Sequence, residues 1–144
     1  GGTIRYTGGN VSTNREAALQ KSTTPNVEKA NTTLTLTGEI SGEGDLIKDG
    51  DGTLSQAFGL HSYSGNTIVR GGTFELKGKD QLGNTPAING RLILEGGRFR
   101  TTGGDSNADG YLNFPVEVRG DKESYLDIDK RTYVKNSFSR RYST

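Results

Sequence analysis

Apolar residues occur along this chain in short bursts. Between Gly42 and Leu76 the bursts are Leu46-Ile47, Leu54, Ile68-Val69, and Phe74 with Leu76. Each burst is too short for a helix, and several alternate with polar residues, which is typical of a strand with one buried face. Glycines separate the bursts, and glycine turns a chain through positive φ without steric cost. The pattern therefore predicts short strands joined by tight corners.

A period of about 20 residues relates these bursts to others further along the chain. Its members are Leu34/Leu36, Leu54, Phe74/Leu76, Leu92/Leu94, Leu112/Phe114 and Thr132/Val134. One rung of a parallel β-helix has roughly this length, so we expect these residues to stack in one column of the core. Secondary columns are expected through Ile47, Val69 and Ile88. The predicted fold is all-β, a parallel β-helix (β-solenoid) with rungs of about 20 residues, and the alternative is a sandwich or meander of antiparallel strands.

A motif in the same stretch resembles a known repeat. The residues that carry it are Gly42, Gly44, Leu46, Lys48, Gly50, Gly52, Thr53 and Leu54, followed by Tyr63, Gly65, Thr67, Val69, Gly72, Thr73 and Phe74. They are similar to G-x-G-x-L-x-K-x-G-x-G-T-L and Y-x-G-x-T-x-V-x-x-G-T-L, the β-strand repeat associated with bacterial autotransporter passenger domains. Here GTF stands in place of the second GTL, the spacer reads SQAFGLHS, and a trailing Leu82-Gly83 follows. The resemblance implies a solenoid that is exported to the cell surface or beyond.

The chain also contains a longer internal likeness. Residues 1–10, GGTIRYTGGN, match residues 96–105, GGRFRTTGGD, with six of ten positions identical. We therefore expect residues 1–144 to form a single β-solenoid segment, made of one long repeat of roughly 95 residues and about half of the next. Residues 14–21, NREAALQK, are the one helix-like patch.

Composition bears on whether the chain folds and on which partners it can bind. Only 29% of the residues are apolar and the mean hydropathy is −0.69, so disorder is the first alternative. Regular placement of the apolar residues argues against it, since a solenoid rung buries only a few side chains. The formal charge of +1 predicts no affinity for nucleic acid, and no apolar run is long enough for membrane insertion of this segment. The absence of cysteine excludes disulfides and thiolate metal sites.

One motif predicts a metal site. Asp105, Asn107 and Asp109 precede Gly110 in the order D-x-N-x-D-G, which is the opening of a calcium-binding loop. The glutamate that closes such a loop is missing, because Val116 occupies its place. The alternative is an Asx-rich turn between rungs. Apart from calcium at this loop, we expect no cofactor.

Other polar residues have plainer interpretations. Asp45, Asp49 and Asp51 lack the tandem glycine pattern of calcium-binding nonapeptides, so we interpret them as solvated corner residues. Asp127 and Asp129 lie on one face of a predicted strand beside Lys130 and Arg131, where a sugar-cleaving enzyme could place its carboxylates. The simpler interpretation is a charged outward face that alternates with inward Leu126 and Ile128.

Neither the histidine nor the tyrosines predict catalysis. His61 is the only histidine and lacks an evident partner base, and we expect no catalytic residue. The tyrosines could stack on sugar rings or fill the corners of a solenoid. They are Tyr6, Tyr63, Tyr111, Tyr125, Tyr133 and Tyr142.

Together these features predict a structural or adhesive extracellular β-solenoid rather than an enzyme. The resemblance to autotransporter passengers implies a stalk or fibre segment on, or released from, the bacterial surface. Neither end shows a charged or helical cap, so we expect head-to-tail self-association or continuation into neighbouring repeats, and a host or matrix glycan or protein as a further partner. The alternatives are a carbohydrate-active β-helix enzyme or sugar-binding module, and a phage tail-fibre segment, which would form trimers.

Overall fold

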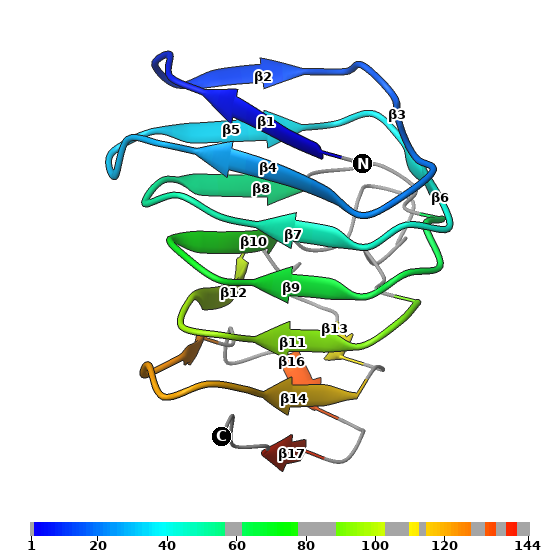
Figure 1. Cartoon of the computed structure of the whole chain (residues 1–144), viewed down its shortest axis with the longest axis vertical. Coiled ribbons are helices and arrows are strands. Elements are labelled where there is room, and N and C mark those ends of the chain that lie inside the picture. The colour runs from blue at the N-terminus through cyan, green and yellow to red at the C-terminus, as the bar shows by residue number, and fades with distance from the viewer. Residues whose placement is uncertain are drawn as a thin grey trace.

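The structure is a stack of parallel strands that coils around one core (Figure 1). It is a computed structural model, and it describes residues 2–56, 62–77, 89–102, 110–112, 115–127, 132–134 and 138–140. All regular elements in these ranges are strands. The chain passes repeatedly from one sheet to a second sheet and back, and each such circuit is one rung.

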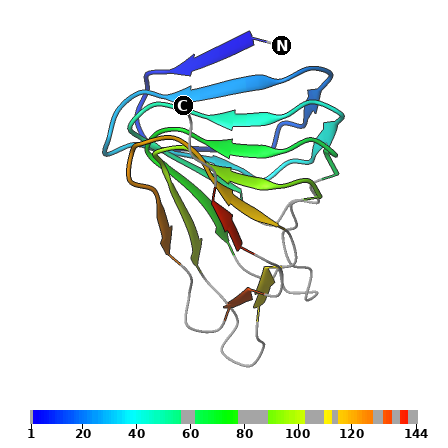
Figure 2. The same cartoon turned by 60° about the horizontal axis from the view of Figure 1, so that its bottom comes forward.

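Two large sheets form the main walls of the coil (Figures 1 and 2). The seven-stranded sheet contains, in spatial order, β1 (Gly2–Tyr6), β4 (Thr23–Val27), β7 (Leu46–Lys48), β9 (Thr67–Val69), β11 (Leu92–Leu94), β14 (Val116–Val118) and β17 (Phe138–Arg140). The six-stranded sheet contains β2 (Val11–Thr13), β5 (Thr33–Leu36), β8 (Thr53–Gln56), β10 (Thr73–Lys77), β12 (Arg98–Thr102) and β15 (Tyr125–Asp127).

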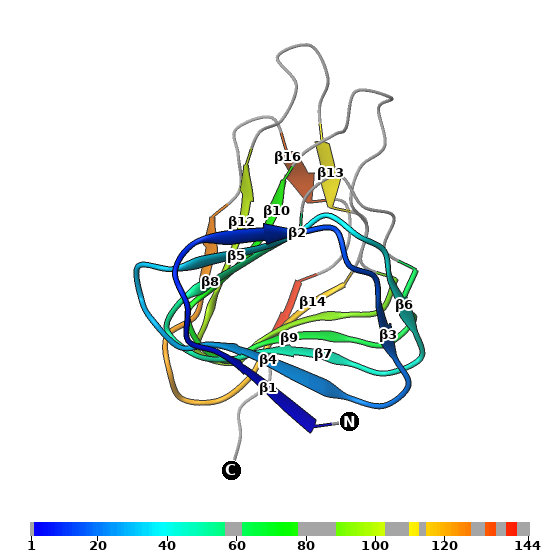
Figure 3. The same ribbon diagram turned by 90° about the horizontal axis from the view of Figure 1, so that it is seen from above.

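Shorter strands complete the rungs. β3 (Ala17–Leu19) pairs with β6 (Ile40–Gly42), and β13 (Gly110–Leu112) pairs with β16 (Thr132–Val134). Seen from above, β3 and β6 form a third side between the two large sheets (Figure 3). The residues that the sequence marked as helix-like, 14–21, therefore do not form a helix. Ala17 and Leu19 face the interior from a strand, and packing against the next rung decides their conformation.

Every strand pairing among the described residues is parallel and successive rungs are in register, so side chains stack in columns. In the six-stranded sheet one inward column runs through Val11, Leu34, Leu54, Phe74, Phe99 and Leu126. Leu54, Phe74 and Phe99 are fully buried, and the rings of Phe74 and Phe99 stack with their centroids 6.1 Å apart. This column forms one wall of the core, and the predicted parallel β-solenoid is confirmed.

The predicted composition of that column is only partly right. Leu34, Leu54 and Phe74 do stack, but Leu92 and Leu94 lie in the seven-stranded sheet, where Leu94 pairs with Val69. Leu112 pairs with Val134 in a small separate sheet. The physical reason is rung length. Rungs average about 23 residues, and a 20-residue period holds only between Leu34 and Phe74. Counting 20 residues on from Phe74 therefore reaches Leu94 in β11, whereas the next member of the column is Phe99 in β12.

Two further expectations concern the secondary column and the two similar decapeptides. The expected column through Ile47 and Val69 is wrong, because Ile47 pairs with Ile68 whereas Val69 pairs with Lys48, and neighbouring positions of a strand face opposite sides of the sheet. Ile88 lies outside the described residues. The two similar decapeptides are not in equivalent places, because β1 belongs to the seven-stranded sheet and β12 to the six-stranded sheet. The single segment over residues 1–144 stays a prediction.

Glycine permits the close stacking of the corners. At Gly65 a Cβ atom would lie 2.1 Å from the carbonyl oxygen of Gly44, which belongs to the previous rung. Gly90 meets Gly65 in the same way, at 2.4 Å. A side chain at either position would separate the rungs.

Within the described ranges, no helix is long and apolar enough to cross a bilayer.

Candidate functional site at the corners and the charged sheet face

A buried lysine holds together the corner that follows β7. Lys48 faces inward and its side chain is fully buried. Its Nζ donates hydrogen bonds to the carbonyl oxygens of Asp49 and Gly50, and to that of Gly71 on the next rung at 3.0 Å. Burial lowers the pKa of Lys48 to about 8, although the carboxylates of Asp49 and Asp51 act to raise it. The ammonium thus bridges two rungs, and its role is structural.

The aspartates of the predicted solvated corners divide into two groups. Asp45 Oδ1 accepts a hydrogen bond from the backbone N–H of Asn66 at 2.7 Å, and Asn66 Oδ1 accepts one from Arg91 N–H at 3.0 Å. Asp49 Oδ1 accepts one from Gly50 N–H at 2.9 Å. These side chains are half-buried and stabilise turns, whereas Asp51 is exposed as expected.

The corners that lead from the seven-stranded to the six-stranded sheet carry alternating charges. Asp49, Arg70, Glu95 and Arg119 follow one another from rung to rung, and Arg70 Nε lies 3.4 Å from Glu95 Oε2. Together with Asp121 and Lys122, they border an open hollow of about 450 Å³. Its lining has both signs of charge, so it suits a partner that is itself of mixed charge.

A second charged surface covers the outer face of the six-stranded sheet. Glu75 is buried there between Ser55, which donates a hydrogen bond at 2.9 Å, and Arg100, whose Nη2 lies 2.8 Å away. One rung further, Arg98 forms an ion pair with Asp127 and lies 4.3 Å above the centre of the Tyr125 ring. The sheet register thus aligns acids, bases and an aromatic ring on one face.

This face has the chemistry of a binding surface. Glu75 and Asp127 are each paired with an arginine, so both carboxylates are already held in ion pairs on this face. Asp127 is exposed, and Leu126 packs against the core, in agreement with the alternating strand expected from the sequence. Asp129, Lys130 and Arg131 lie outside the described residues.

The tyrosines serve different purposes. Tyr63 is buried, shares a 2.6 Å hydrogen bond with the hydroxyl of Thr67, and has its pKa raised mainly by burial. Tyr6 packs against the core at the first rung. Tyr125 is 42% exposed on the charged sheet face, and the hydrogen bond that its hydroxyl donates to Glu123 is the main cause of its raised pKa. Only Tyr125 among these three is placed to meet a partner.

The predicted calcium loop belongs to a part of the chain that the structure does not describe. Asp105, Asn107 and Asp109 lie outside the described residues, and so does His61. In the part of the chain that is described, no three His, Cys, Asp or Glu side chains come together in a way that could hold a metal ion. The calcium site therefore stays a prediction.

Sequence reasoning singled out Asp49, Tyr125 and Asp127 on these surfaces, but not the residues that pair with them. Glu75, Arg98 and Arg100 come together only through sheet register, and nothing local in the sequence signals it. The corner at Arg119 does have a local signal, since an Arg-Gly-Asp tripeptide directly follows an apolar strand.

Comparison with known proteins shows distant and partial homology to autotransporters. The chain is 32% identical to the adhesin BmaC autotransporter of Brucella suis over 138 residues, an alignment that covers 76% of this chain and 4% of that protein. It is 39% identical over 74 residues to the autotransporter lipoprotein NalP of Neisseria meningitidis, covering 51% of this chain and 6% of that protein. The chain thus spans only a small fraction of either relative.

Other comparisons add no further assignment. No family model matches the chain, and no solved structure matches it significantly. The homology and the solenoid nevertheless agree with each other, because the motif at Gly42–Leu76 supplies the inward Leu46, the inward Lys48 and the corner glycines.

Proposed function

Because the chain is a β-solenoid with distant, partial homology to autotransporters, we propose that it is a non-enzymatic segment of a passenger that is secreted or displayed on a bacterial surface. It acts as a stiff stalk whose outer faces are adhesive. The observation that carries this proposal is the parallel pairing of successive rungs in the two large sheets, from β1 to β17 and from β2 to β15. Such a ladder gives length and stiffness from short repeats.

The outer surface supports an adhesive role. The charged sheet face and the alternating corners present both signs of charge along the stack, which is a surface for specific protein or glycan contacts rather than for non-specific attraction. Similarity to a protein named as an adhesin points in the same direction.

The first rung supports self-association or continuation of the stalk. Ile4 and Val11 belong to inward-facing columns, but they are 65% and 41% exposed because no rung lies above them. β1 and β2 also have a free edge each (Figure 1). A free parallel edge with an uncovered apolar interior favours pairing with another rung, either from neighbouring repeats or from a second copy.

An attachment assay tests the adhesive role. Beads coated with the folded chain should attach to animal epithelial cells more than beads coated with heat-unfolded chain. The same preparations should release no sugar from a panel of polysaccharides. Equal attachment by folded and unfolded chain would contradict the adhesive role, and released sugar would contradict the absence of enzyme activity.

Sedimentation tests the open end. The wild-type chain should associate as its concentration rises, and the double variant Ile4→Glu, Val11→Glu should remain a monomer because it places charge on the uncovered interior. The matched control is the double variant Thr3→Glu, Ser12→Glu, since Thr3 and Ser12 are exposed on the outward faces of the same two strands. A wild-type chain that stays monomeric at millimolar concentration would contradict self-association.

A further inference from the structure

The corner between β14 and β15 differs from the other corners that join the two large sheets. It contains six residues, 119–124, whereas the corners of the earlier rungs contain three to five, with three each in the two that precede it, 70–72 and 95–97. In Figures 1 and 3 this orange corner projects beyond the two green corners of the rungs above it. Its sequence is RGDKES, so the projecting part begins with an Arg-Gly-Asp tripeptide.

The rung above holds this corner at both ends. The N–H of Arg119 donates to the carbonyl oxygen of Leu94 at 2.8 Å, and Ser124 Oγ accepts a hydrogen bond from Gly96 N–H at 2.8 Å. Between these two anchors, Asp121, Lys122 and Glu123 are exposed. A short loop fixed at both ends loses little conformational entropy on binding, which favours its recognition by a partner.

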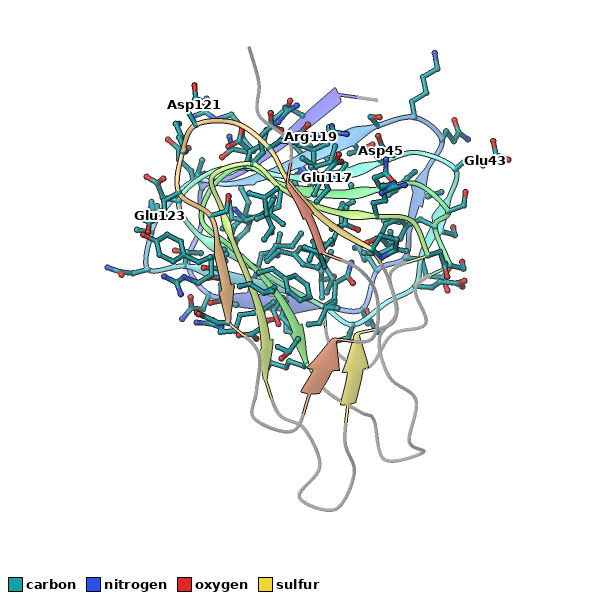
Figure 4. All side chains as sticks on the ribbon, turned by 90° about the horizontal axis from the view of Figure 1, so that it is seen from below. Glu43, Asp45, Glu117, Arg119, Asp121 and Glu123 are labelled. Carbon is teal, nitrogen blue, oxygen red and sulfur yellow. The ribbon has the colours of Figure 1, made fainter. Side chains whose placement is uncertain are left out.

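The glycine sets the directions of the two charged side chains. Gly120 has a φ of +83°, which turns the backbone sharply between Arg119 and Asp121. Seen from below, Asp121 lies on the outer side of the corner, and Arg119 lies over the end of β14 (Figure 4). The side chain of Arg119 is 42% exposed, and one of its nitrogens, Nη2, lies 2.8 Å from Glu117 Oε2. A guanidinium has five N–H donors, so others remain for a partner.

A second corner has the same backbone turn without the basic residue. Asp49, Gly50 and Asp51 follow β7, Gly50 has a φ of +80°, and Asp51 is exposed. The two corners therefore present an aspartate after a glycine of nearly the same conformation. They differ in the preceding residue, which is Asp49 in one and Arg119 in the other. Of these two corners, only the one at Gly120 has opposite charges on the two sides of its glycine, because Gly50 lies between two aspartates.

The partner can be described by its chemistry. A carboxylate is a hard oxygen ligand that suits Mg²⁺, Mn²⁺ or Ca²⁺, and a single carboxylate cannot hold such an ion alone. A partner that binds Asp121 through such an ion has to supply the ion and its other ligands. A guanidinium prefers a carboxylate that it can bind with two parallel hydrogen bonds. The partner needs an acidic group for Arg119 as well as a divalent cation for Asp121.

We propose that the corner 119–124 presents Arg119, Gly120 and Asp121 to a metal-dependent cell-surface receptor that reads an Arg-Gly-Asp loop. Asp121 binds the receptor's divalent cation, and Arg119 forms an ion pair with a receptor carboxylate. The hollow beside the loop, bordered by Arg70 and Glu95, leaves room for a receptor side chain next to the tripeptide. This inference rests on the proposed adhesive function and names the partner class for it.

Direct binding to purified receptors tests the inference. The chain is immobilised, and a panel of integrin ectodomains that recognise Arg-Gly-Asp is passed over it in Mn²⁺ buffer. We expect saturable binding to at least one member, abolished by EDTA and displaced by a cyclic Arg-Gly-Asp peptide. The Asp121→Glu variant keeps the charge but lengthens the side chain, and it should weaken binding at least about tenfold. Arg119→Lys should weaken it too, because the two parallel hydrogen bonds are lost.

The matched control is Asp51→Glu, the same change at the corner with the same turn, and it should bind as the wild type does. Both exposed changes should leave the melting temperature unaltered, which excludes misfolding. Absence of binding to the whole panel, or equal binding by wild type and Asp121→Glu, would overturn the inference. If coated beads still attach to cells in that case, the adhesive function survives and only the named partner is wrong.

Discussion

The first rung and the middle rungs share one pattern of side chains but differ in burial. Val11 and Leu54 belong to the same inward column of the six-stranded sheet, yet Val11 is 41% exposed and Leu54 is fully buried. Leu54 has a rung on each side, whereas Val11 has a rung on one side only. The difference shows that the alternating pattern chooses which side chains face inward, whereas the neighbouring rungs supply the burial that stabilises them.

Glycines at the corners show the same difference between the first rung and the middle rungs. A Cβ at Gly9, in the first rung, would meet nothing within 4 Å, whereas a Cβ at Gly65 would lie 2.1 Å from a backbone oxygen of the rung above. Both glycines stand at corners, but only the one inside the stack is required by its neighbours. Stability should therefore be concentrated in the middle of the stack.

Truncation of the two column residues should give the largest contrast. Leu54→Ala should lower the free energy of unfolding by about 2–5 kcal/mol, because it leaves a cavity between two rungs. Val11→Ala should lower it by less than about 1 kcal/mol, because the side chain is already half in water. Urea unfolding followed by circular dichroism measures both. Equal losses at the two positions would contradict the stacked column.

Substitution of the two corner glycines should give the next largest contrast. Gly65→Ala should cost about 3 kcal/mol, because the new methyl group meets the backbone of the adjacent rung, which cannot move without breaking the ladder. Gly9→Ala should change the free energy of unfolding by no more than about 0.5 kcal/mol. Thermal unfolding compares the variants. A well-tolerated Gly65→Ala would mean that the rungs at this corner are further apart than described.

The smallest expected effect concerns the buried lysine and depends on pH. Because the pKa of Lys48 is lowered to about 8 in the folded chain, the unfolded chain binds more protons between about pH 8 and its ordinary pKa of 10.5. Stability from this group should therefore rise with pH in that window, by about 1–2 kcal/mol between pH 7 and pH 10.

Lys48→Met serves as the control for that prediction, since it removes the titrating group but keeps the length of the side chain. Tyr63 acts in the opposite direction above pH 10, because burial raises its pKa and the folded chain then keeps its proton longer. The difference in free energy between wild type and Lys48→Met should grow in favour of the wild type from pH 7 to pH 10. A difference that stays constant would contradict the lowered pKa.

Much of the fold could be predicted from the sequence, because it depends on local pattern. The corner glycines and the stack of Leu34, Leu54 and Phe74 follow from alternation and period. The buried Lys48 does not, because alternation predicts a polar side chain on the outer face. The position of Leu94 could not be predicted in this way. The column passes from Phe74 to Phe99, a longer step than the period allows, and only the three-dimensional register shows it.

The candidate site was less predictable for the same reason. Glu75, Arg98 and Asp127 are far apart in the sequence, and parallel register brings them to one face. Ala17 and Leu19 have helical propensity, but pairing with Ile40 and Gly42 overrides it. The corner at Arg119 was visible in the sequence as a tripeptide, but its length relative to other corners and its projection required the structure.

The central claim is that Thr33, Thr53, Thr73, Arg98 and Tyr125 lie one above another on the outer face of the six-stranded sheet. Pulsed dipolar spin-label spectroscopy tests it directly, because the chain has no native cysteine to compete with introduced labels. With strands about 4.8 Å apart, labels at 33 and 98 should be separated by about 14 Å, and labels at 33 and 125 by about 19 Å. A separation that does not grow by about one strand spacing between the two pairs would contradict the ladder.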